Sequence, residues 1–312
     1  HVDRMVKLLE DRGVVEVVRI NSEEYPSQAR FSIRLGSATS TGQLLLEASN
    51  RTIELDRLTS VWFRHPSPPF VPDLADERDR RFAVAQAKES LVGFLQSQDN
   101  VRWINSPWQE RAAENKLRQA VVAMSVGLAV PEHIVTNDPT VAKEFITAEP
   151  TIYKPLLHAA FTVDSDDTSM RTAATMVVTE EHLSHLDGVR YSPALFQRWV
   201  AKDKEYRVTI IDGLCFTAQI DPHRSQGGAI DWRESEEHVH LEEGSLPKAV
   251  QDAVLEMMAA FDLSYAAIDL ILGTDGVYYF LDLNPSGQFL FIEDALPALQ
   301  MSDALCSALE NA

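Results

Sequence analysis

Three polar side chains interrupt two apolar segments near the carboxyl end of the chain. Asp269 lies within residues 267–271, whereas Asp282 and Asn284 lie within residues 279–284. A Gly-Thr-Asp-Gly turn separates the two segments, so they predict a β-hairpin in which Asp282 and Asn284 face the same side. Carboxylates are costly to bury without compensation, and Mg²⁺ prefers carboxylate, phosphate and water oxygens. The hairpin is therefore a candidate magnesium site; the alternative is a hairpin whose polar residues only cap the strand ends.

Two lysines upstream of this hairpin could supply positive charge. Lys116 follows Asn115 near the start of a predicted helix, and Lys154 lies within a predicted strand over residues 151–156. An ammonium group inside an apolar strand is costly to bury unless it has a partner. Cations that contact phosphates, combined with carboxylates that bind Mg²⁺, are the usual equipment for phosphoryl transfer. The sequence contains neither a Walker-type loop nor a Gly-x-Gly-x-x-Gly fingerprint, so a nucleotide site here must be of another kind.

The elements that would position these residues divide the chain into three regions. We predict an N-terminal α/β lobe over residues 1–106, a central α+β lobe over residues 107–192 and a carboxyl-terminal lobe over residues 193–312. Apolar residues at helical spacing predict helices over residues 2–11, 74–97, 111–126, 138–144, 247–261 and 294–309. Besides the hairpin, strands are predicted over residues 14–20, 31–35, 43–47, 51–54, 61–64, 101–104, 131–136, 151–156, 172–178, 206–211 and 214–220. Because the chain begins directly in a helical pattern, we expect that a short preceding strand is missing.

The composition limits the partners and compartments to be expected. The chain has 312 residues, of which 45% are hydrophobic, and a formal net charge of -19. This acidity disfavours non-specific binding to nucleic acid or to an acidic membrane surface. No apolar run approaches the ~20 residues needed to span a bilayer. Cys215 and Cys306 are far apart and lie among apolar residues, which favours a reducing compartment, so we expect a cytoplasmic protein without nucleic-acid or membrane partners.

Six short motifs occur in an order that resembles the ATP-grasp superfamily over residues 106–293. They are Asn-Lys-Leu at 115–117, Tyr-Lys-Pro at 153–155, Phe-Gln-Arg-Trp-Val at 196–200, Glu-Tyr-Arg at 205–207, Ile-Asp-Leu at 268–270 and Leu-Asp-Leu-Asn-Pro-Ser-Gly at 281–287. The resemblance implies an α/β fold with α+β lobes, in which the central and carboxyl-terminal lobes clamp ATP. The first hundred residues then take the place of the lobe that precedes them.

The resemblance also implies which residues bind the nucleotide. Lys116 and Lys154 are expected to contact the α- and β-phosphates, and Glu205 is expected to hold the ribose hydroxyls. The hinge is expected to pair with adenine through backbone groups of Gln197, Arg198, Trp199 and Val200. Two features depart from the family pattern. The hinge position that is usually acidic is an arginine here, and the loop after Lys154, over residues 157–161, has no glycine.

The remaining roles concern the metal ions and the transferred phosphoryl group. The resemblance implies that Asp269, Asp282 and Asn284 bind two Mg²⁺ ions. It also implies that Arg207 steadies the transferred phosphoryl group and the acyl phosphate, which suits the planar fork of arginine. The alternative for Arg207 is a salt bridge with a nearby acidic residue at the end of a strand.

A narrower resemblance points to a peptide substrate. The chain is similar to the microviridin-type maturases of ribosomal peptides, the graspetide synthetases, in residues 61–66, 104–107, 231–233 and 284–293. That family closes macrocycles in a ribosomally made precursor peptide by joining Asp or Glu side chains to Thr or Ser as esters, or to Lys as amides, and it tends to form homodimers. The resemblance places Asp231 and Arg233 beside the acceptor side chain; the alternative for this pair is a local ion pair in a loop.

These features together predict an ATP-dependent carboxylate ligase. A peptide carboxylate would attack the γ-phosphate of ATP to give an acyl phosphate and ADP, and a second side chain of the same peptide would then displace phosphate. Asp231 is a candidate general base for a hydroxyl nucleophile. Two alternatives are a ligase that joins free amino acids, of the glutamate-ligase kind, and a nucleotide-binding regulatory protein that has lost turnover.

Overall fold

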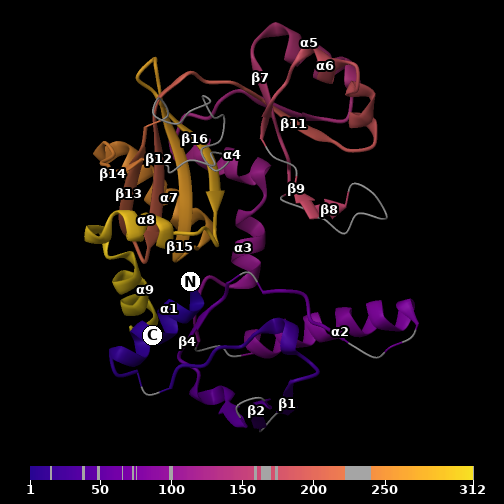
Figure 1. Ribbon diagram of the computed structural model, residues 1–312, viewed down its shortest axis with the longest axis vertical. Helices are drawn as coiled ribbons and strands as arrows, with labels where there is room; N and C mark the ends of the chain where they lie inside the picture. Colours follow the sequence, from indigo (N-terminus) through magenta and orange to yellow (C-terminus); the bar gives the residue numbers. More distant parts are fainter. Residues whose placement is uncertain are drawn as a thin grey trace. The chain divides into compact units, whose positions relative to one another are not determined.

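The structure is a computed structural model in which the chain forms two compact units (Figure 1). Unit 1 comprises residues 1–110 and 300–312, and unit 2 comprises residues 111–299. The structure describes residues 1–14, 16–36, 39–47, 50–64, 66–71, 74, 76–97, 101–157, 160–162, 170–172, 175–221 and 240–311. None of the helices in these ranges combines the length and the apolar character that crossing a membrane requires. The predicted division into three lobes stays a prediction.

Unit 1 is built on a three-stranded antiparallel sheet and a long helix. Strands β1 (Ala29–Gly36), β2 (Thr39–Leu46) and β3 (Arg51–Glu54) pair in the order β1-β2-β3. Helix α2 (Glu77–Gln96) packs only its second half against this sheet, because its buried side chains begin at Ala87. This arrangement gives unit 1 a hydrophobic core of its own.

The remaining elements of unit 1 bring the end of the chain beside its beginning. Strand β4 (Ser60–Trp62) pairs in parallel with β5 (Arg102–Ile104). Helix α1 (Val2–Asp11) contacts helix α9 (Met301–Glu310). The guanidinium of Arg12 donates hydrogen bonds to two carboxylates of α9, at 2.7 and 2.9 Å. The unit also contains the 3-10 helices η1 (Ser22–Glu24) and η2 (Leu55–Arg57).

One predicted strand of unit 1 is wrong. Residue 14 and residues 16–20 form no strand, and the carbonyl of Val17 accepts a hydrogen bond of 3.0 Å from the Arg51 guanidinium. A side chain thus takes the place that a neighbouring strand would have to fill. The other helices and strands predicted for this unit are confirmed with shifted ends; α2, for example, begins later because Asp76 caps its first turn.

The first part of unit 2 is a small sheet covered by short helices. The strands, in the order β10-β7-β11-β6, are β10 (Met176–Val177), β7 (Thr151–Lys154), β11 (Ala194–Arg198) and β6 (His133–Thr136). Apolar side chains of α5 (Pro139–Ala148) and of η3 (Leu186–Arg190) pack against Phe196 of this sheet. Helix α6 (Glu180–Leu183) and a separate strand pair, β8 (Ala160–Thr162) and β9 (Met170–Thr172), are also present.

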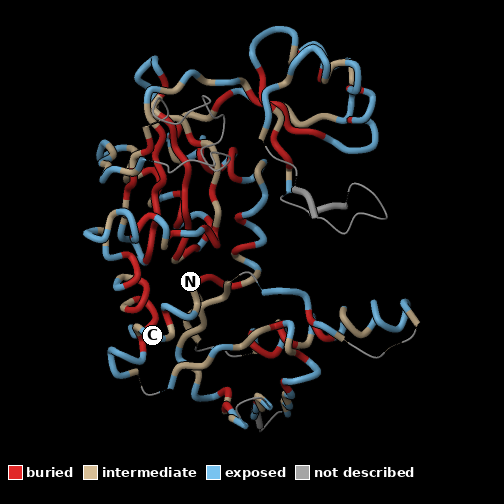
Figure 2. Tube along the Cα trace, in the orientation of Figure 1, coloured by how far each residue is buried: buried red, intermediate tan, exposed pale blue. Residues whose placement is uncertain are grey.

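The second part of unit 2 is a five-stranded antiparallel sheet. Its strands, in order, are β14 (Leu241–Glu243), β13 (Leu214–Ile220), β12 (Lys202–Ile211), β15 (Tyr265–Gly273) and β16 (Tyr278–Asn284). Figure 2 shows that buried residues are concentrated in these strands. The predicted hairpin around Asp269 is confirmed as β15 and β16, which pair antiparallel.

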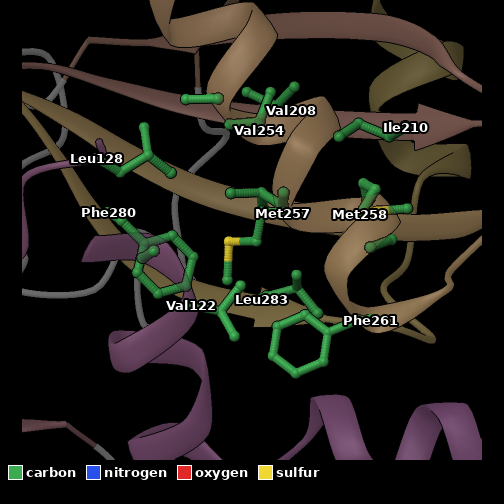
Figure 3. Packing of buried hydrophobic residues seen from close by; sticks show 14 of the residues in the cluster. Val122, Leu128, Val208, Ile210, Val254, Met257, Met258, Phe261, Phe280 and Leu283 are labelled. Atoms are coloured by element: carbon green, nitrogen blue, oxygen red, sulfur yellow. The ribbon is translucent and has the colours of Figure 1, made fainter. Parts of the chain in front are cut away.

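Helix α7 (Lys248–Phe261) covers one face of this sheet. Figure 3 shows Met257 of α7 among core side chains that include Val208 and Ile210 of β12. Side chains alternate along a strand, so Glu205, Arg207 and Thr209 face the opposite side of the sheet. The core therefore turns the polar residues of β12 toward the face that α7 leaves open. Burial raises the pKa of the Tyr206 hydroxyl, which lies on the core face.

Two predicted helices are wrong as single helices. The helix predicted over residues 111–126 is two helices, α3 (Pro107–Ala113) and α4 (Lys116–Ser125). The helix predicted over residues 294–309 is divided into α8 (Leu290–Ala295), η5 (Pro297–Leu299) and α9. Proline has no N–H to continue a helix, which accounts for the second break. The strand predicted over residues 172–178 is also wrong as one strand, since Thr175 belongs to no strand and β10 covers only Met176–Val177; residues 173 and 174 lie outside the described residues.

The first break is caused by an N-cap, and it can be tested. The side chain of Asn115 accepts a hydrogen bond of 3.0 Å from the Arg118 N–H and so starts a new helix at Lys116. We expect Asn115→Ala to lower the free energy of unfolding by about 1 kcal/mol, whereas Asn115→Asp, which keeps the acceptor, stays near the parent value. Urea unfolding measures both variants. Equal stability of the two variants would show that the cap contributes nothing.

Candidate nucleotide and metal site

A cleft in unit 2 lies between its two sheets and encloses about 710 Å³, including space open to solvent. Side chains from α4, β7, β11, β12, β15 and β16 line it. Nine residues that the sequence analysis assigned to nucleotide or metal binding contribute to the lining: Lys116, Lys154, Gln197, Arg198, Trp199, Val200, Glu205, Asp269 and Asp282. The fold therefore brings together, in one cleft, residues that are up to 166 positions apart in the sequence.

The acidic side of the cleft is set by the pairing of β15 with β16. Asp269 lies directly opposite Asp282, and the next pair is Leu270 with Phe280, so Leu281 is an extra residue in β16. Such a bulge reverses the alternation of side chains along a strand. It allows Phe280 and Leu283 to enter the same core while Asp282 faces the cleft.

A cation accompanies each carboxylate. Lys116 Nζ lies 2.8 Å from Asp282 Oδ1, and Arg207 Nη1 lies 2.8 Å from Asp269 Oδ1. The Arg207 and Asp269 side chains are only 4% and 6% exposed. Lys154, which is also buried, donates from Nζ to the Leu281 carbonyl at 3.2 Å. Positive groups suited to phosphate thus stand beside negative groups suited to a cation.

The predicted metal ligands are hard oxygen donors. Two carboxylates and the amide of Asn284 suit Mg²⁺, which takes a few protein oxygens and completes its shell with phosphate oxygens and water. Within the described ranges there is no cluster of three His, Cys, Asp or Glu side chains that could hold a metal. Asp269 and Asp282 line the cleft, whereas Asn284 is not among its lining residues. Two carboxylates fit a metal whose shell is completed by phosphate oxygens and water.

A tight turn after β16 packs against Arg207. Asn284 Oδ1 accepts a hydrogen bond of 3.0 Å from the Ser286 N–H, and Tyr265 donates its hydroxyl proton to the Gly287 carbonyl at 2.5 Å. A Cβ atom at Gly287 would lie 2.8 Å from Arg207 Nη2 and 2.4 Å from the side chain of Ala267. Glycine at this position is therefore what lets the turn approach the Arg207 guanidinium so closely.

The side chain of Arg198, one of the four expected hinge residues and the last residue of β11, is held by contacts with neighbouring elements. Its Nη1 donates to the Phe145 carbonyl at 2.7 Å and to Thr151 Oγ1 at 3.1 Å, and its guanidinium lies 3.6 Å from the centre of the Phe145 ring. Its Nε contacts Glu132 Oε2 at 3.2 Å. The backbone N–H groups of Arg198 and Trp199 donate to other protein carbonyls. The Arg198 side chain thus binds the carboxyl end of α5, and the expected nucleotide contact of this residue would have to use its carbonyl.

The sequence analysis missed Lys202. Its Nζ lies 2.5 Å from Glu205 Oε2, and the two side chains are 15% and 6% exposed and line the cleft. In a regular strand, residues three apart face opposite sides. An irregularity in the pairing of β12 between Lys202 and Lys204 brings Lys202 to the side of Glu205. The signal in the sequence was a lysine three residues before the predicted ribose ligand. The alternation of polar and apolar residues in the sequence did not reveal the bulge that turns this lysine toward the cleft.

Two predicted catalytic residues cannot be placed. Asp231 and Arg233 lie outside the described residues, as does most of the polar loop that follows the strand with Lys154. Their expected place beside the acceptor side chain stays a prediction. All other predicted site residues are among the described residues of unit 2, where Trp199 and Val200 lie in the connection between β11 and β12.

The chain has an ATP-grasp fold, as predicted. Residues 1–111 match the family model described as the MvdD pre-ATP grasp domain. Over nearly its whole length the chain is similar to peptide-modifying ATP-grasp ligases, which confirms the resemblance found in the sequence motifs. No match was found among curated protein sequences.

Three solved structures illustrate this similarity. The first is the macrocyclase MdnC of Microcystis aeruginosa MRC bound with precursor peptide MdnA, with a TM-score of 0.86 and 27% identity over 99% of this chain and 95% of MdnC. The second is a RiPP-associated ATP-grasp ligase of Chryseobacterium gregarium in complex with ADP and a leader and core peptide, with a TM-score of 0.87 and 25% identity over 99% of this chain and 92% of that chain. The third is the macrocyclase MdnB of Microcystis aeruginosa MRC, with a TM-score of 0.80 and 26% identity over 99% of this chain and 94% of MdnB.

Proposed function

We propose that this protein is an ATP-dependent ligase that closes side-chain macrocycles in a ribosomally made precursor peptide. The observation that supports this most is the cleft itself, where Lys116 pairs with Asp282 and Arg207 with Asp269. The similarity to a macrocyclase bound with its precursor peptide and to a ligase bound with ADP favours a peptide substrate and an adenine nucleotide.

The cleft residues divide the binding of the nucleotide among them. Lys116 and Lys154 contact the phosphates, and Glu205, steadied by Lys202, accepts hydrogen bonds from the ribose hydroxyls. Adenine pairs with the backbone of the hinge. Two of the four hinge N–H groups already donate to protein carbonyls, and Gln197 is paired with strands on both of its sides. The donor proposed for adenine is therefore the N–H of Val200.

The reaction has two steps, and each crosslink costs the peptide one molecule of water in total. A carboxylate oxygen of the peptide attacks the γ-phosphorus of ATP, and ADP leaves with the bridging oxygen. A hydroxyl or amine of the same peptide then attacks the acyl carbon, and phosphate leaves. Bound Mg²⁺ supplies charge neutralisation along the phosphates. Lys116 and Lys154 offset charge that moves toward the β-phosphate, and Arg207 orients the phosphoryl group and the acyl phosphate.

The test is a reconstitution with purified enzyme, MgATP and a candidate precursor peptide, taken from a short open reading frame beside the gene. We expect mass spectrometry to show the loss of one water per crosslink together with ADP release. ADP release without dehydration of the peptide would contradict the macrocyclase proposal. Dehydrating ligation of free amino acids instead would establish the glutamate-ligase alternative.

Size-exclusion chromatography of the same sample tests whether the protein forms a homodimer, a state that only the family resemblance suggests.

Whether the link is an ester or an amide depends on the acceptor side chain. We propose that Asp231 and Arg233 lie at that side chain, with Arg233 orienting the peptide carboxylate through its two-pronged guanidinium. Fragmentation of the crosslinked product identifies the joined residues. The variants Asp231→Asn and Arg233→Lys should lower crosslinking while leaving ADP affinity unchanged; a loss of ADP affinity would place the pair at the nucleotide instead.

The anchoring of the hinge by Arg198 gives a separate prediction. Replacing Arg198 with Met removes charge-assisted hydrogen bonds to the Phe145 carbonyl of α5 and to Thr151 Oγ1 of β7, each worth roughly 1.5–3 kcal/mol. We expect the KM for ATP to rise about tenfold with a smaller change in kcat, because the hinge binds adenine and takes no part in the chemistry. Steady-state kinetics with varied ATP measures the effect.

The matched control for Arg198 is its exposed partner. The Glu132 side chain is 70% exposed, so Glu132→Gln should change KM by less than about twofold. An Arg198→Met enzyme with the parent KM would contradict the anchoring role, and so would a fall in kcat with KM unchanged.

A further inference from the structure

Helix α4 and strand β16 are joined by a buried carboxamide that no step of the reaction uses. The Gln119 side chain is 3% exposed. Its Nε2 donates to the Leu283 carbonyl at 2.7 Å and to the Ala113 carbonyl at 2.7 Å, and its Oε1 accepts from the Leu283 N–H at 3.1 Å. One side chain therefore satisfies both backbone groups of a single strand residue.

The position of that strand residue gives the contact its importance. Leu283 lies between Asp282 and Asn284, the two proposed metal ligands of β16. On the same helix, Lys116 lies three residues before Gln119 and therefore on the same face, and its ammonium pairs with Asp282. Two side chains from one face of α4 thus hold two consecutive residues of β16.

Strand β16 needs such a partner because it is the edge strand of its sheet. An edge strand presents backbone groups that no further strand pairs with. Here other groups of unit 2 take that place: the Ala129 carbonyl accepts from the Phe280 N–H at 2.8 Å, the Lys154 ammonium donates to Leu281, and Gln119 bonds Leu283. Only the last of these contacts lies between the metal-binding side chains.

We propose that Gln119 is a positioning residue that sets the oxygens of Asp282 and Asn284 against the phosphate-binding Lys116, so that the affinity for the magnesium–nucleotide complex depends on it. The proposal rests on the proposed function, since it assigns β16 to the metal. Groups that orient the side chains binding a metal typically change its affinity by 10–100-fold when they are removed, as a rough guide. The loss should therefore appear in the magnesium dependence of nucleotide binding.

The test uses ADP and MgCl₂ with the full chain and no peptide. Isothermal titration calorimetry measures ADP affinity in EDTA and at a series of Mg²⁺ concentrations. Gln119→Met keeps the volume of the side chain and removes all three hydrogen bonds. We expect the Mg²⁺ concentration for half-maximal tightening of ADP to rise at least about tenfold, with a much smaller change of ADP affinity in EDTA.

Two further variants keep the test decisive. Arg118→Met introduces the same side chain at an exposed neighbouring position of α4 and should leave both values unchanged. Gln119→Glu keeps the acceptor for the Leu283 N–H but loses the donors, so it should shift the magnesium dependence in the same direction even if Gln119→Met folds poorly. A thermal melt checks the folding of each variant.

The outcomes separate this proposal from the macrocyclase function. If Gln119 variants bind magnesium and ADP like the parent, or lose ADP affinity equally in EDTA, the positioning role is overturned. If the Mg²⁺ dependence of ADP binding shifts as expected but the precursor peptide is never dehydrated, the positioning role is supported and the macrocyclase function is contradicted. A parent protein that binds no ADP at all would overturn both.

Discussion

Replacing Asp282 with Asn is expected to reduce turnover about a thousandfold while the protein stays folded. Asp282 faces the cleft and pairs with Lys116 at 2.8 Å, so the change replaces a charged proposed metal ligand with a neutral one and removes the anionic partner of Lys116. A bound metal contributes several kcal/mol of charge stabilisation in the transition state, and each 1.4 kcal/mol or so is a factor of ten in rate. Asn284→Ala should show the same pattern with a smaller loss, because an amide is a neutral ligand.

The hairpin itself offers the matched control for this variant. Asp275 is an exposed carboxylate in the turn between β15 and β16, where it accepts a hydrogen bond of 2.7 Å from the Tyr279 hydroxyl. Asp275→Asn changes the same side chain in the same hairpin but outside the cleft, so its kcat should stay within about twofold of the parent. Initial rates at saturating MgATP measure all three variants. Full activity of Asp282→Asn and Asn284→Ala would overturn the metal assignment.

Replacing Arg207 with Met is expected to lower the free energy of unfolding by roughly 3–5 kcal/mol and to abolish turnover. The cause of the stability loss is the buried carboxylate of Asp269, whose ion pair at 2.8 Å is removed. Turnover is lost because the guanidinium is the group proposed to orient the phosphoryl group. The double variant Arg207→Met/Asp269→Leu removes both charges and should recover most of the stability but none of the turnover.

The recovery by the double variant separates the two roles of the pair. Urea unfolding reports stability, and ADP release reports turnover. The surface pair of Lys248 and Asp252, whose side chains are 81% and 46% exposed, is the control for charge removal, and Lys248→Met should cost less than about 1 kcal/mol. Turnover restored by the double variant would contradict the role of Arg207. A double variant as unstable as the single one would show that the stability loss has a cause other than the unpaired carboxylate.

Much of the site was predictable because it depends on local patterns. The hairpin carrying Asp269 and Asp282 follows from apolar segments separated by a turn, and the confirmed α7 follows from its helical spacing of apolar residues. The lysines and carboxylates, taken with the order of the motifs, predicted phosphate and magnesium binding, and those of positions 116, 154, 269 and 282 line one cleft. The failures concern elements whose fate depends on contacts: the run at residues 14–20 has the apolar content of a strand, but a strand exists only where another one pairs with it.

The amino-acid sequence by itself determined which chemical groups are present and which segments alternate with period two or follow a helix. Only the tertiary structure decided the partners: Lys116 with Asp282, Arg198 with the end of α5, and Gln119 with Leu283. It also decided which way side chains face beyond the bulges in β12 and β16. The physical reason is that one extra residue reverses the alternation of a strand, and the pairing that shows where the extra residue lies comes from the neighbouring strand.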